Sequence, residues 1–550
     1  MKRVVIIGGV AGGASAAARL RRMDESVEIV LLERGPYISF ANCGLPYHIS
    51  GEISAREDLL VQTPERFSKR FNVDVRIHHE AIEIDPKEHR VVVKADGQVY
   101  SLNYDKLLLS PGASAIKPNL PGMDDARVLL LRSLPDMDQI IAQLQHVTKD
   151  RPIAVLGAGF IGLEITEALH QLGYCVMLIE AGAQVMASID PEMASPLHRT
   201  LRQHGIDLRL NSALKAVRPQ TEELVLELSS GESVDVSMLI CAVGVRAENQ
   251  LAQQAGLVLG QGHSIQVNQH LQTSDPDIYA VGDAIEVIDW VTGQPASIPL
   301  AGPANRQGRI AADNMAGREC EYRGTQGSSI CRVFDLAVAS TGASEKRLKA
   351  QQIAYRKLYT HSSQHAGYYP GAQPIHLKLL FSPDNGRLLG GQAVGKDGVD
   401  KRIDVLALAL QAQMSVYDLE ELELCYAPPY GSAKDPLNQA GFVAVNWLEG
   451  NDELIYPEQV ADYQGQILDI RNEAELQNGM LPNALHIPLD ELRTRMNELN
   501  PTLPIMVYCQ VGLRGHVAAR MLCQSGWKVV NLTGGYRTYC DWQQSQQGEL

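Results

Sequence analysis

Residues 3–13 read RVVIIGGVAGG, an apolar run that ends in a cluster of glycines. A short apolar run bounded by glycine is typical of a buried strand, and the glycines suit a turn into a helix where a phosphate can approach the backbone. We therefore predict a strand over residues 3–7, a helix over 12–22 and a second strand over 27–33, which together form a βαβ unit. Val10 stands where the common G-x-G-x-x-G pattern has its middle glycine, so this motif alone is weak.

A carboxylate and a second module strengthen this interpretation. Glu33 follows Gly13 by twenty positions, at the end of the second predicted strand, where it can bond a ribose hydroxyl. The same order returns as a strand over 152–156, a helix over 157–172 that opens on glycines, and a strand over 175–180. The chain is therefore expected to bind two dinucleotides. Glu180 would repel a phosphate on the ribose, which favours NADH over NADPH.

Length and composition limit the other possibilities. The chain has 550 residues and a mass of 60.2 kDa, which corresponds to about three or four domains. A formal net charge of −15 makes nucleic acid an unlikely partner, although local arginine clusters could still bind a phosphate ligand. The sequence contains no zinc pattern, and we expect no metal site.

The cysteines and the first residues predict a cytoplasmic protein without a membrane span. The nine cysteines are odd in number and show no Cys-x-x-Cys spacing, which fits a reducing compartment. Lys2 and Arg3 precede an apolar run, as in an export signal, but cleavage there would delete the glycine turn. The run is also too short to cross a bilayer.

One cysteine stands in a distinctive segment. Residues 39–47 read SFANCGLPY. Reductases that use a pair of cysteines have the second one five residues after the first, but His48 occupies that position here, so Cys43 has no such partner. This segment resembles the active-site segment of coenzyme A disulfide reductases. The resemblance covers residues 1–446 and includes the segments 273–283 and 299–308. It implies that the first module binds FAD and the second NADH. The implied FAD contacts are Gly8, Gly13, Glu33, Ala81, Asp283 (on the ribitol chain) and Ala301, and the implied NADH contacts are Gly157, Gly159, Ile161, Gly162, Glu180 and Gly244.

The resemblance also implies the domain organisation, an α/β fold with two nested Rossmann-like domains. An FAD-binding domain would comprise residues 1–115 and 250–327, with an NAD-binding domain inserted at 116–249. An α+β dimerisation domain would follow at 328–446. The polar stretch after it predicts a linker at 447–457, and a separate C-terminal α/β domain is expected at 458–550.

The chemistry expected of Cys43 is attack on a sulfur atom. Such an attack needs a thiolate, which a helix N-terminus or a nearby positive charge favours. By resemblance, NADH reduces FAD, electrons pass to a mixed disulfide at Cys43, and a thiol or sulfide leaves. The implied coenzyme A contacts are Ser15, Arg19, Arg22, Ser39, Asn42, Arg70, Asn305 and Lys434. Arginines one helical turn apart can bracket phosphates, but a solvated helix face would show the same spacing.

Two tyrosines resemble residues that cross the dimer interface in these reductases. They are Tyr368 and Tyr426, and in this interpretation their phenols donate a proton or hydrogen bond to a leaving thiolate. Tyrosines that only pack at an interface are a common alternative. The functional interpretation requires a homodimer.

The last hundred residues resemble a rhodanese, with Cys509 and Arg514 at the two ends of the loop CQVGLR. Such a loop directs backbone N–H groups at a thiolate or persulfide, and Arg514 adds positive charge. Related phosphatases place five residues between cysteine and arginine, whereas this loop has four, which favours sulfur chemistry. A degenerate regulatory domain is the alternative.

Two sulfur sites in one chain give a functional hypothesis. Cys509 accepts sulfane sulfur and passes it, directly or through a coenzyme A persulfide, to Cys43 for reduction to sulfide. The substrate could be coenzyme A persulfide, polysulfide or coenzyme A disulfide. One alternative is an NADH oxidase or peroxide reductase with an incidental rhodanese, although related peroxide reductases have a histidine where this chain has Ala11. The other alternative is a persulfide-responsive redox sensor.

Overall fold

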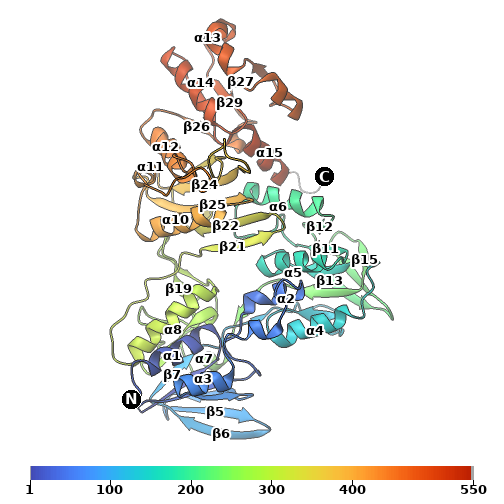
Figure 1. The fold of residues 1–550 in the computed structure, drawn as a ribbon, viewed down its shortest axis with the longest axis vertical. Helices are drawn as coiled ribbons and strands as arrows, with labels where there is room; N and C mark the ends of the chain where they lie inside the picture. Colours follow the sequence, from blue (N-terminus) through green and yellow to red (C-terminus); the bar gives the residue numbers. More distant parts are fainter. Residues whose placement is uncertain (1, 547–550) are drawn as a thin grey trace. The chain divides into compact units, whose positions relative to one another are not determined.

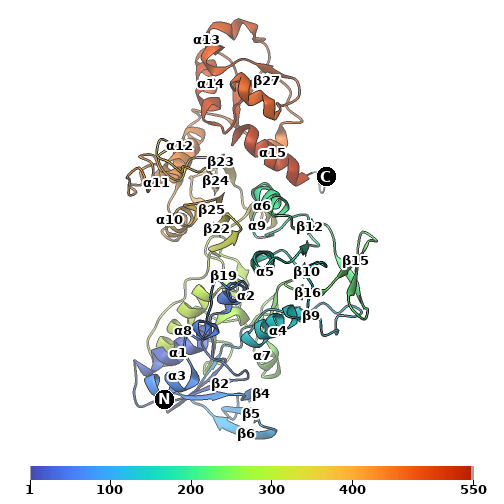
Figure 2. The same ribbon diagram turned by 45° about the vertical axis from the view of Figure 1, so that its right-hand side comes forward.

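The structure is a computed structural model that describes residues 2–546, so the predicted domain ends at residues 1 and 547–550 lie outside it. The chain folds as two compact units. The first unit comprises residues 1–178 and 214–327, and the second comprises 179–213 and 328–550. Figure 1 and Figure 2 show the helices and strands of each unit.

The first unit contains a five-stranded parallel sheet with the order β18-β7-β1-β2-β3. Helices α1 and α8 pack against each other beside it. The nearly continuous apolar sequence of the central strands is expected for a parallel sheet that is covered on both faces. The elements are β1 (Arg3–Ile7), α1 (Ala11–Arg21), β2 (Glu28–Glu33), α3 (Pro64–Phe71), β3 (Asp74–Ile77), β7 (Lys106–Leu109), β18 (Ile278–Ala280) and α8 (Ala301–Met315).

The rest of the first unit includes the second nucleotide-binding module. Strands β11, β10, β16 and β9 are successive neighbours in its sheet. Strands β8 and β17 pair where the chain enters and leaves this module. The elements are β8 (Ala113–Ala115), β9 (Val128–Leu130), α4 (Leu134–Leu144), β10 (Ile153–Leu156), α5 (Phe160–Gln171), β11 (Val176–Ile179), β16 (Met238–Cys241) and β17 (Val245–Ala247). Two antiparallel sheets are formed by β4 (Glu80–Asp85), β5 (Arg90–Ala95) and β6 (Gln98–Asn103), and by β13 (Leu214–Pro219), β14 (Leu224–Leu228) and β15 (Ser233–Val236).

The second unit is built on an antiparallel sheet with the order β21-β22-β25-β24-β23. Helices α6 and α10 contact its central strand β25, and α12 contacts β23 and β24. Strands β24 and β25 are buried along their whole length. The elements are α6 (Pro191–Gln203), β21 (Ser329–Val333), β22 (Leu336–Gly342), α9 (Glu345–Ala350), β23 (Arg356–Thr360), β24 (Ile375–Phe381), β25 (Leu388–Gly395), α10 (Val399–Gln411), α11 (Val416–Glu420) and α12 (Pro436–Leu448).

The C-terminal part of the second unit is a parallel sheet with the order β26-β30-β29-β27-β28. Helix α14 packs against β29 and β30. The elements are β26 (Leu454–Ile455), β27 (Gln466–Asp469), β28 (Ala484–His486), α13 (Leu492–Arg495), β29 (Ile505–Tyr508), α14 (Leu513–Gln524), β30 (Val529–Leu532) and α15 (Gly535–Gln546).

Some predicted boundaries differ from the structure. Helix α5 begins at Phe160 rather than at 157, because residues 157–159 form the glycine turn itself. The connecting segment is shorter than the predicted linker 447–457, because α12 extends to Leu448 and β26 is already a strand of the C-terminal sheet. No helix within residues 2–546 has both the length and the apolar character needed to cross a membrane.

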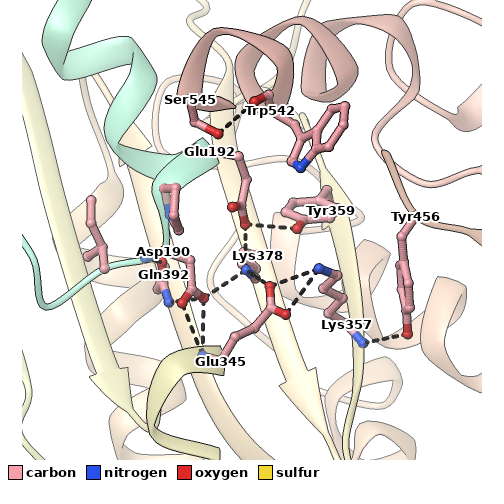
Figure 3. A network of polar contacts seen from close by, with 12 residues as sticks. Asp190, Glu192, Glu345, Lys357, Tyr359, Lys378, Gln392, Tyr456, Trp542 and Ser545 are labelled. Carbon is pink, nitrogen blue, oxygen red and sulfur yellow. Dashed lines mark hydrogen bonds and ion pairs between the residues drawn. The ribbon is translucent and has the colours of Figure 1, made fainter. Parts of the chain in front are cut away.

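A buried ammonium group lies at the centre of a polar network in the second unit (Figure 3). Lys378 on β24 is 0% exposed, and its Nζ contacts Asp190 at 2.7 Å, Glu345 at 2.5 Å and Glu192. The spacing of the three carboxylates would suit a metal ion, but Nζ of Lys378 already contacts each of them. Gln392 donates to Asp190 at 2.7 Å. The network therefore connects α6, α9, β24 and β25.

The charges in this network depend on one another. Burial opposes ionisation of Lys378, but Glu192, Tyr359 and the other carboxylates raise the pKa of its ammonium well above the usual value. Burial also opposes ionisation of Glu345, but Lys378 and Lys357 hold the pKa of that carboxyl well below its usual range. The ions are therefore mutually compensated inside a water-poor core.

Residues of β23 and α6 join the C-terminal part of the chain to the same region. The Tyr359 backbone N–H donates to Thr533 Oγ1 at 3.0 Å, and the Tyr359 hydroxyl donates to Glu192 at 2.8 Å. Lys357 contacts Glu458 at 2.7 Å, and Ser195 donates to the carbonyl of Asp541 at 2.7 Å. Strand β23 and helix α6 thus both bind the C-terminal part of the chain.

Replacing the buried lysine should strongly destabilise the second unit. Lys378→Met removes the cation that the three buried carboxylates share, and loss of one partner from such a buried cluster typically costs about 3–5 kcal/mol. Chemical denaturation monitored by circular dichroism measures the loss. The control is Lys396→Met, because Lys396 is 53% exposed and contacts the exposed Asp335. Such a surface pair contributes about 0–1 kcal/mol, so equal effects of the two substitutions would contradict the assigned role of Lys378.

The second unit should also lose stability in mild acid. Burial, together with Arg202 and Arg199, lowers the pKa of His198 to about 4. Burial likewise lowers the pKa of His361 and of His376. A histidine in the unfolded chain has a pKa of about 6.5. As the pH falls below that value, the unfolded state binds more protons than the folded state, and the free energy of unfolding decreases.

Melting temperatures recorded from about pH 7 to pH 5 test this expectation. His198→Gln removes one of the titrating groups and should therefore flatten part of the pH dependence. A glutamine oxygen can still accept the Val185 N–H bond that Nε2 of His198 accepts at 3.1 Å, so the local structure is kept. A melting temperature that stays constant over this range would be the contrary result.

Candidate active sites

The first glycine turn is shaped to receive an anionic ligand. Helix α1 has no side-chain cap at Val10 and no acidic residue in its first turn, so its N-terminal N–H groups can meet a phosphate. Gly8 has a φ of +98°, and a Cβ there would meet the Ser110 carbonyl oxygen at 2.0 Å. Glu33 accepts from the Gly9 N–H at 2.9 Å, which places its carboxylate beside the turn. These features fit FAD at the predicted residues.

The second turn has the same features. Gly157 has a φ of +99°, and Gly159 precedes α5 without a side-chain cap. A Cβ on Gly159 would meet no atom within 4 Å, so a ligand can approach the backbone there. Glu180 directly follows β11 and accepts from the Gly182 N–H at 2.8 Å. The glycine turn fits the phosphate of a dinucleotide, and Glu180 stands at the strand end that the sequence predicts.

The remaining cofactor candidates lie at element ends or in the sheets. Asp283 lies in a 3-10 turn after β18 and accepts from Arg132 at 3.1 Å. Gly244 has a φ of +112° and lies just before β17. The other predicted positions are Ala81 in β4, Ile161 in the first turn of α5 and Ala301 at the start of α8.

Cys43 lies in a 3-10 turn, Asn42–Gly44, that leads directly into helix α2 (Leu45–Ile49). The cysteine is exposed and unpaired, and its charged neighbours are Glu164, Arg132 and Asp283. Asn42 donates to the Arg132 carbonyl at 3.3 Å. The structure therefore brings the predicted nucleophile and the predicted ribitol-binding aspartate into one site.

The protein groups around Cys43 do not favour its thiolate. Burial of the sulfur raises the pKa of Cys43, although the residue as a whole is exposed, and Glu164 and Asp283 raise it further. Only Arg132 acts in the opposite direction. Among the described protein groups, burial and the two carboxylates therefore outweigh Arg132, and the pKa of Cys43 lies above its usual value.

The predicted coenzyme A contacts are partly grouped. Ser15 and Asn305 are hydrogen-bonded at 2.5 Å between α1 and α8. Arg19 forms an ion pair with Asp313 at 2.8 Å rather than standing on a solvated face. Arg22 is exposed just beyond the end of the same helix. The other candidates are Ser39, with a φ of +46°, the half-buried Asn42, the exposed Arg70 on α3 and, in the second unit, the exposed Lys434.

The two predicted tyrosines contact each other. The hydroxyls of Tyr368 and Tyr426 are 2.8 Å apart, and the side chains are exposed. The hydrogen bond from Tyr426 raises the pKa of Tyr368, so this phenol stays protonated near neutral pH. The pair is therefore available as a proton or hydrogen-bond donor to a group outside the unit.

The C-terminal cysteine lies in a loop between β29 and α14. Cys509 is buried, and the Gly512 N–H donates to its sulfur at 3.1 Å. Arg514 interacts with the same sulfur, and Glu475 raises the pKa of the Arg514 guanidinium through two hydrogen bonds. The loop can thus stabilise an anionic sulfur at its centre.

Sequence reasoning missed three charged residues of these sites. Arg132 and Glu164 lie beside Cys43, and Glu475 binds Arg514. None belongs to a recognised motif, and each comes from an element distant in sequence from the cysteine it affects. No motif in the sequence therefore indicates these three residues.

Comparison with known proteins agrees with the geometry. Residues 2–308 match the pyridine nucleotide-disulphide oxidoreductase family, 328–435 match its dimerisation domain, and 456–541 match the rhodanese-like domain. A solved structure of reduced Bacillus anthracis CoADR-RHD is 47% identical, with a TM-score of 0.96 and 98% of each chain covered.

Two further relatives are informative. A NAD-dependent persulfide reductase from A. fulgidus is 35% identical, with a TM-score of 0.91, covering 98% of this chain and 99% of that one. Coenzyme A disulfide reductase of Staphylococcus haemolyticus is 36% identical over 81% of this chain and 99% of its own length. The matches confirm the predicted α/β fold class, the FAD and NAD cofactors and the rhodanese domain. The chain belongs to the pyridine nucleotide-disulphide oxidoreductase family, with a rhodanese-like domain at its C-terminal end.

Proposed function

We propose that this protein is an NADH-dependent reductase of coenzyme A persulfide, polysulfide or coenzyme A disulfide that acts through Cys43. The observation that carries the proposal is the exposed, unpaired Cys43 beside Asp283, in a chain that holds a second cysteine in an anion-stabilising loop. Sulfide or a thiol is the product. A cytoplasmic homodimer is part of the proposal, and the dimerisation domain supports it.

Cys43 supplies the nucleophile in this scheme. Its thiolate attacks the coenzyme A-bound sulfur of the persulfide, the S–S bond breaks, and sulfide leaves with the electron pair. FAD, which Gly8, Gly13, Glu33 and Asp283 would hold, would supply the two electrons, taken from NADH, that the resulting mixed disulfide needs. One proton is also consumed, and the Cys43 thiolate and the coenzyme A thiol are released.

Several side chains would support these steps. Arg132 is the cation that favours the thiolate of Cys43. The paired phenols of Tyr368 and Tyr426, from the partner subunit in this proposal, would donate to the leaving sulfur. Ser15, Asn305 and the exposed Arg22 would contact coenzyme A at the N-terminal module. Glu180 would select NADH by repelling a ribose phosphate.

The C-terminal domain would deliver sulfur to this centre. Cys509 accepts a sulfane sulfur, and the Gly512 N–H and Arg514 stabilise the persulfide anion. The sulfur then reaches Cys43 directly or on coenzyme A. The similarity to a NAD-dependent persulfide reductase over 98% of the chain supports this assignment.

Replacing Cys43 should abolish NADH-driven sulfide release. Cys43→Ser removes the attacking sulfur while it leaves the glycine turns intact, so the flavin should still bind. Anaerobic assays with coenzyme A persulfide measure sulfide and NADH consumption. Cys175→Ser, at another exposed and unpaired cysteine, should retain activity.

Two results would contradict the assignment of Cys43. One is sulfide release that persists in Cys43→Ser. The other is oxygen or peroxide consumption by the unsubstituted protein at rates above its sulfide release, which would favour an NADH oxidase or peroxide reductase.

Replacing Cys509 should affect substrates unequally. Cys509→Ser should impair turnover of polysulfide or protein-bound persulfide more than turnover of coenzyme A persulfide, because the small donor can reach Cys43 without the relay. Steady-state sulfide formation from each donor gives the ratio. The matched control is Cys523→Ser, an exposed cysteine on α14 of the same domain. Equal losses on all donors would rule out the relay.

A further inference from the structure

The sulfur-binding loop of the C-terminal domain contains a single charged side chain. Of residues 509–514, only Arg514 is a cation, and it interacts with the sulfur of Cys509. The loop residue Leu513 is 66% exposed. A sulfur donor that approaches Cys509 therefore meets one guanidinium and an apolar side chain.

Glu475 neutralises this guanidinium. Its carboxylate accepts from both terminal nitrogens of Arg514, at 2.7 Å and 2.6 Å, in the bidentate geometry that gives strong charge-assisted bonds. The Arg514 hydrogen bonds lower the pKa of Glu475, so the carboxyl is ionised at neutral pH. The cation of the loop and its counterion thus form a pair without net charge.

The position of Glu475 is itself fixed. Its carboxylate accepts from the Asn472 N–H at 3.1 Å, and its carbonyl accepts from Arg471 at 3.4 Å. Arg471 is 0% exposed and forms a 2.7 Å ion pair with the buried Asp469. The backbone of Glu475 is therefore fixed by buried groups, and its carboxylate is held in place beside Arg514.

We propose that Glu475 is a positioning residue that sets the sulfur-donor specificity of Cys509. By pairing with Arg514 it favours organic persulfides, whose terminal sulfur carries at most one negative charge, over dianionic thiosulfate. The inference rests on the proposed function, because it requires that Cys509 accepts sulfane sulfur. It deepens that proposal by naming the class of donor.

The two donors place different charges at the loop. With an organic persulfide, the Cys509 thiolate attacks the terminal sulfur, the S–S bond breaks, and a thiolate leaves with the electron pair. With thiosulfate, the same attack expels sulfite, and three negative charges must gather near Cys509. An ionised Glu475 repels the thiosulfate dianion, whereas an Arg514 without this counterion would attract it.

Glu475→Gln tests this role in the full-length flavoprotein. Without NADH, peptide mass spectrometry follows the addition of one sulfur to Cys509 from thiosulfate or from cysteine persulfide. The thiosulfate concentration for half-maximal rate should fall about tenfold, as expected for removal of one nearby charge, whereas the value for cysteine persulfide changes little. The thiosulfate rate should also become more sensitive to ionic strength, because Arg514 is no longer neutralised.

The matched control is Glu473→Gln, which removes the same charge from the same 3-10 helix at an exposed residue without a contact to Arg514 among the described residues. It should leave both donors unaffected. The inference is overturned if the two variants respond alike, or if Glu475→Gln slows both donors equally. If the unsubstituted protein loads no sulfur on Cys509 from any donor, the proposed relay fails instead.

Discussion

The buried ammonium of Lys378 is the interaction on which the second unit depends. Three carboxylates from α6 and α9 converge on it, and it is the cation that all three share at that depth. Helix α6 follows the second nucleotide-binding turn in sequence, yet it is fixed to the antiparallel sheet by these charges. The same sheet then binds the C-terminal domain through Tyr359 and Lys357. One polar cluster thus connects three segments that are far apart in the chain.

The polar groups around the two cysteines differ. Around Cys43, two carboxylates and burial oppose the thiolate, and only Arg132 favours it. Around Cys509, a backbone N–H and Arg514 favour an anionic sulfur. A thiol with a raised pKa is less ionised at neutral pH, but its thiolate is intrinsically the stronger nucleophile.

Local signals in the sequence predicted the modules well. The glycine cluster and Glu33 located the first turn, and α1 begins at Ala11, one residue from its predicted start. The start of α5 was less accurate, because the sequence does not show how many glycine-turn residues precede the first helical residue. The predicted linker, residues 447–457, is longer than the connection in the structure. The reason is that a strand of two residues, Leu454 and Ile455, cannot be recognised in the sequence without its partner β30.

Long-range charge pairing could not be predicted. Asp190, Glu345 and Lys378 lie in separate elements, and only the fold brings them together. The pairing of Arg514 with Glu475 is hidden for the same reason, although Arg514 itself was identified from the loop spacing. Motifs reveal residues that act on a ligand, whereas partners that tune those residues come from wherever the packing provides a neighbour.

The contacts of strand β23 have a consequence for chain cleavage. The peptide between Leu448 and Leu454 is the covalent connection to the C-terminal domain, but Thr533, Glu458 and Asp541 bind the preceding part of the unit independently of it. A protease that cut this short segment would therefore leave two fragments that remain associated and elute together, and only a denaturant would separate them.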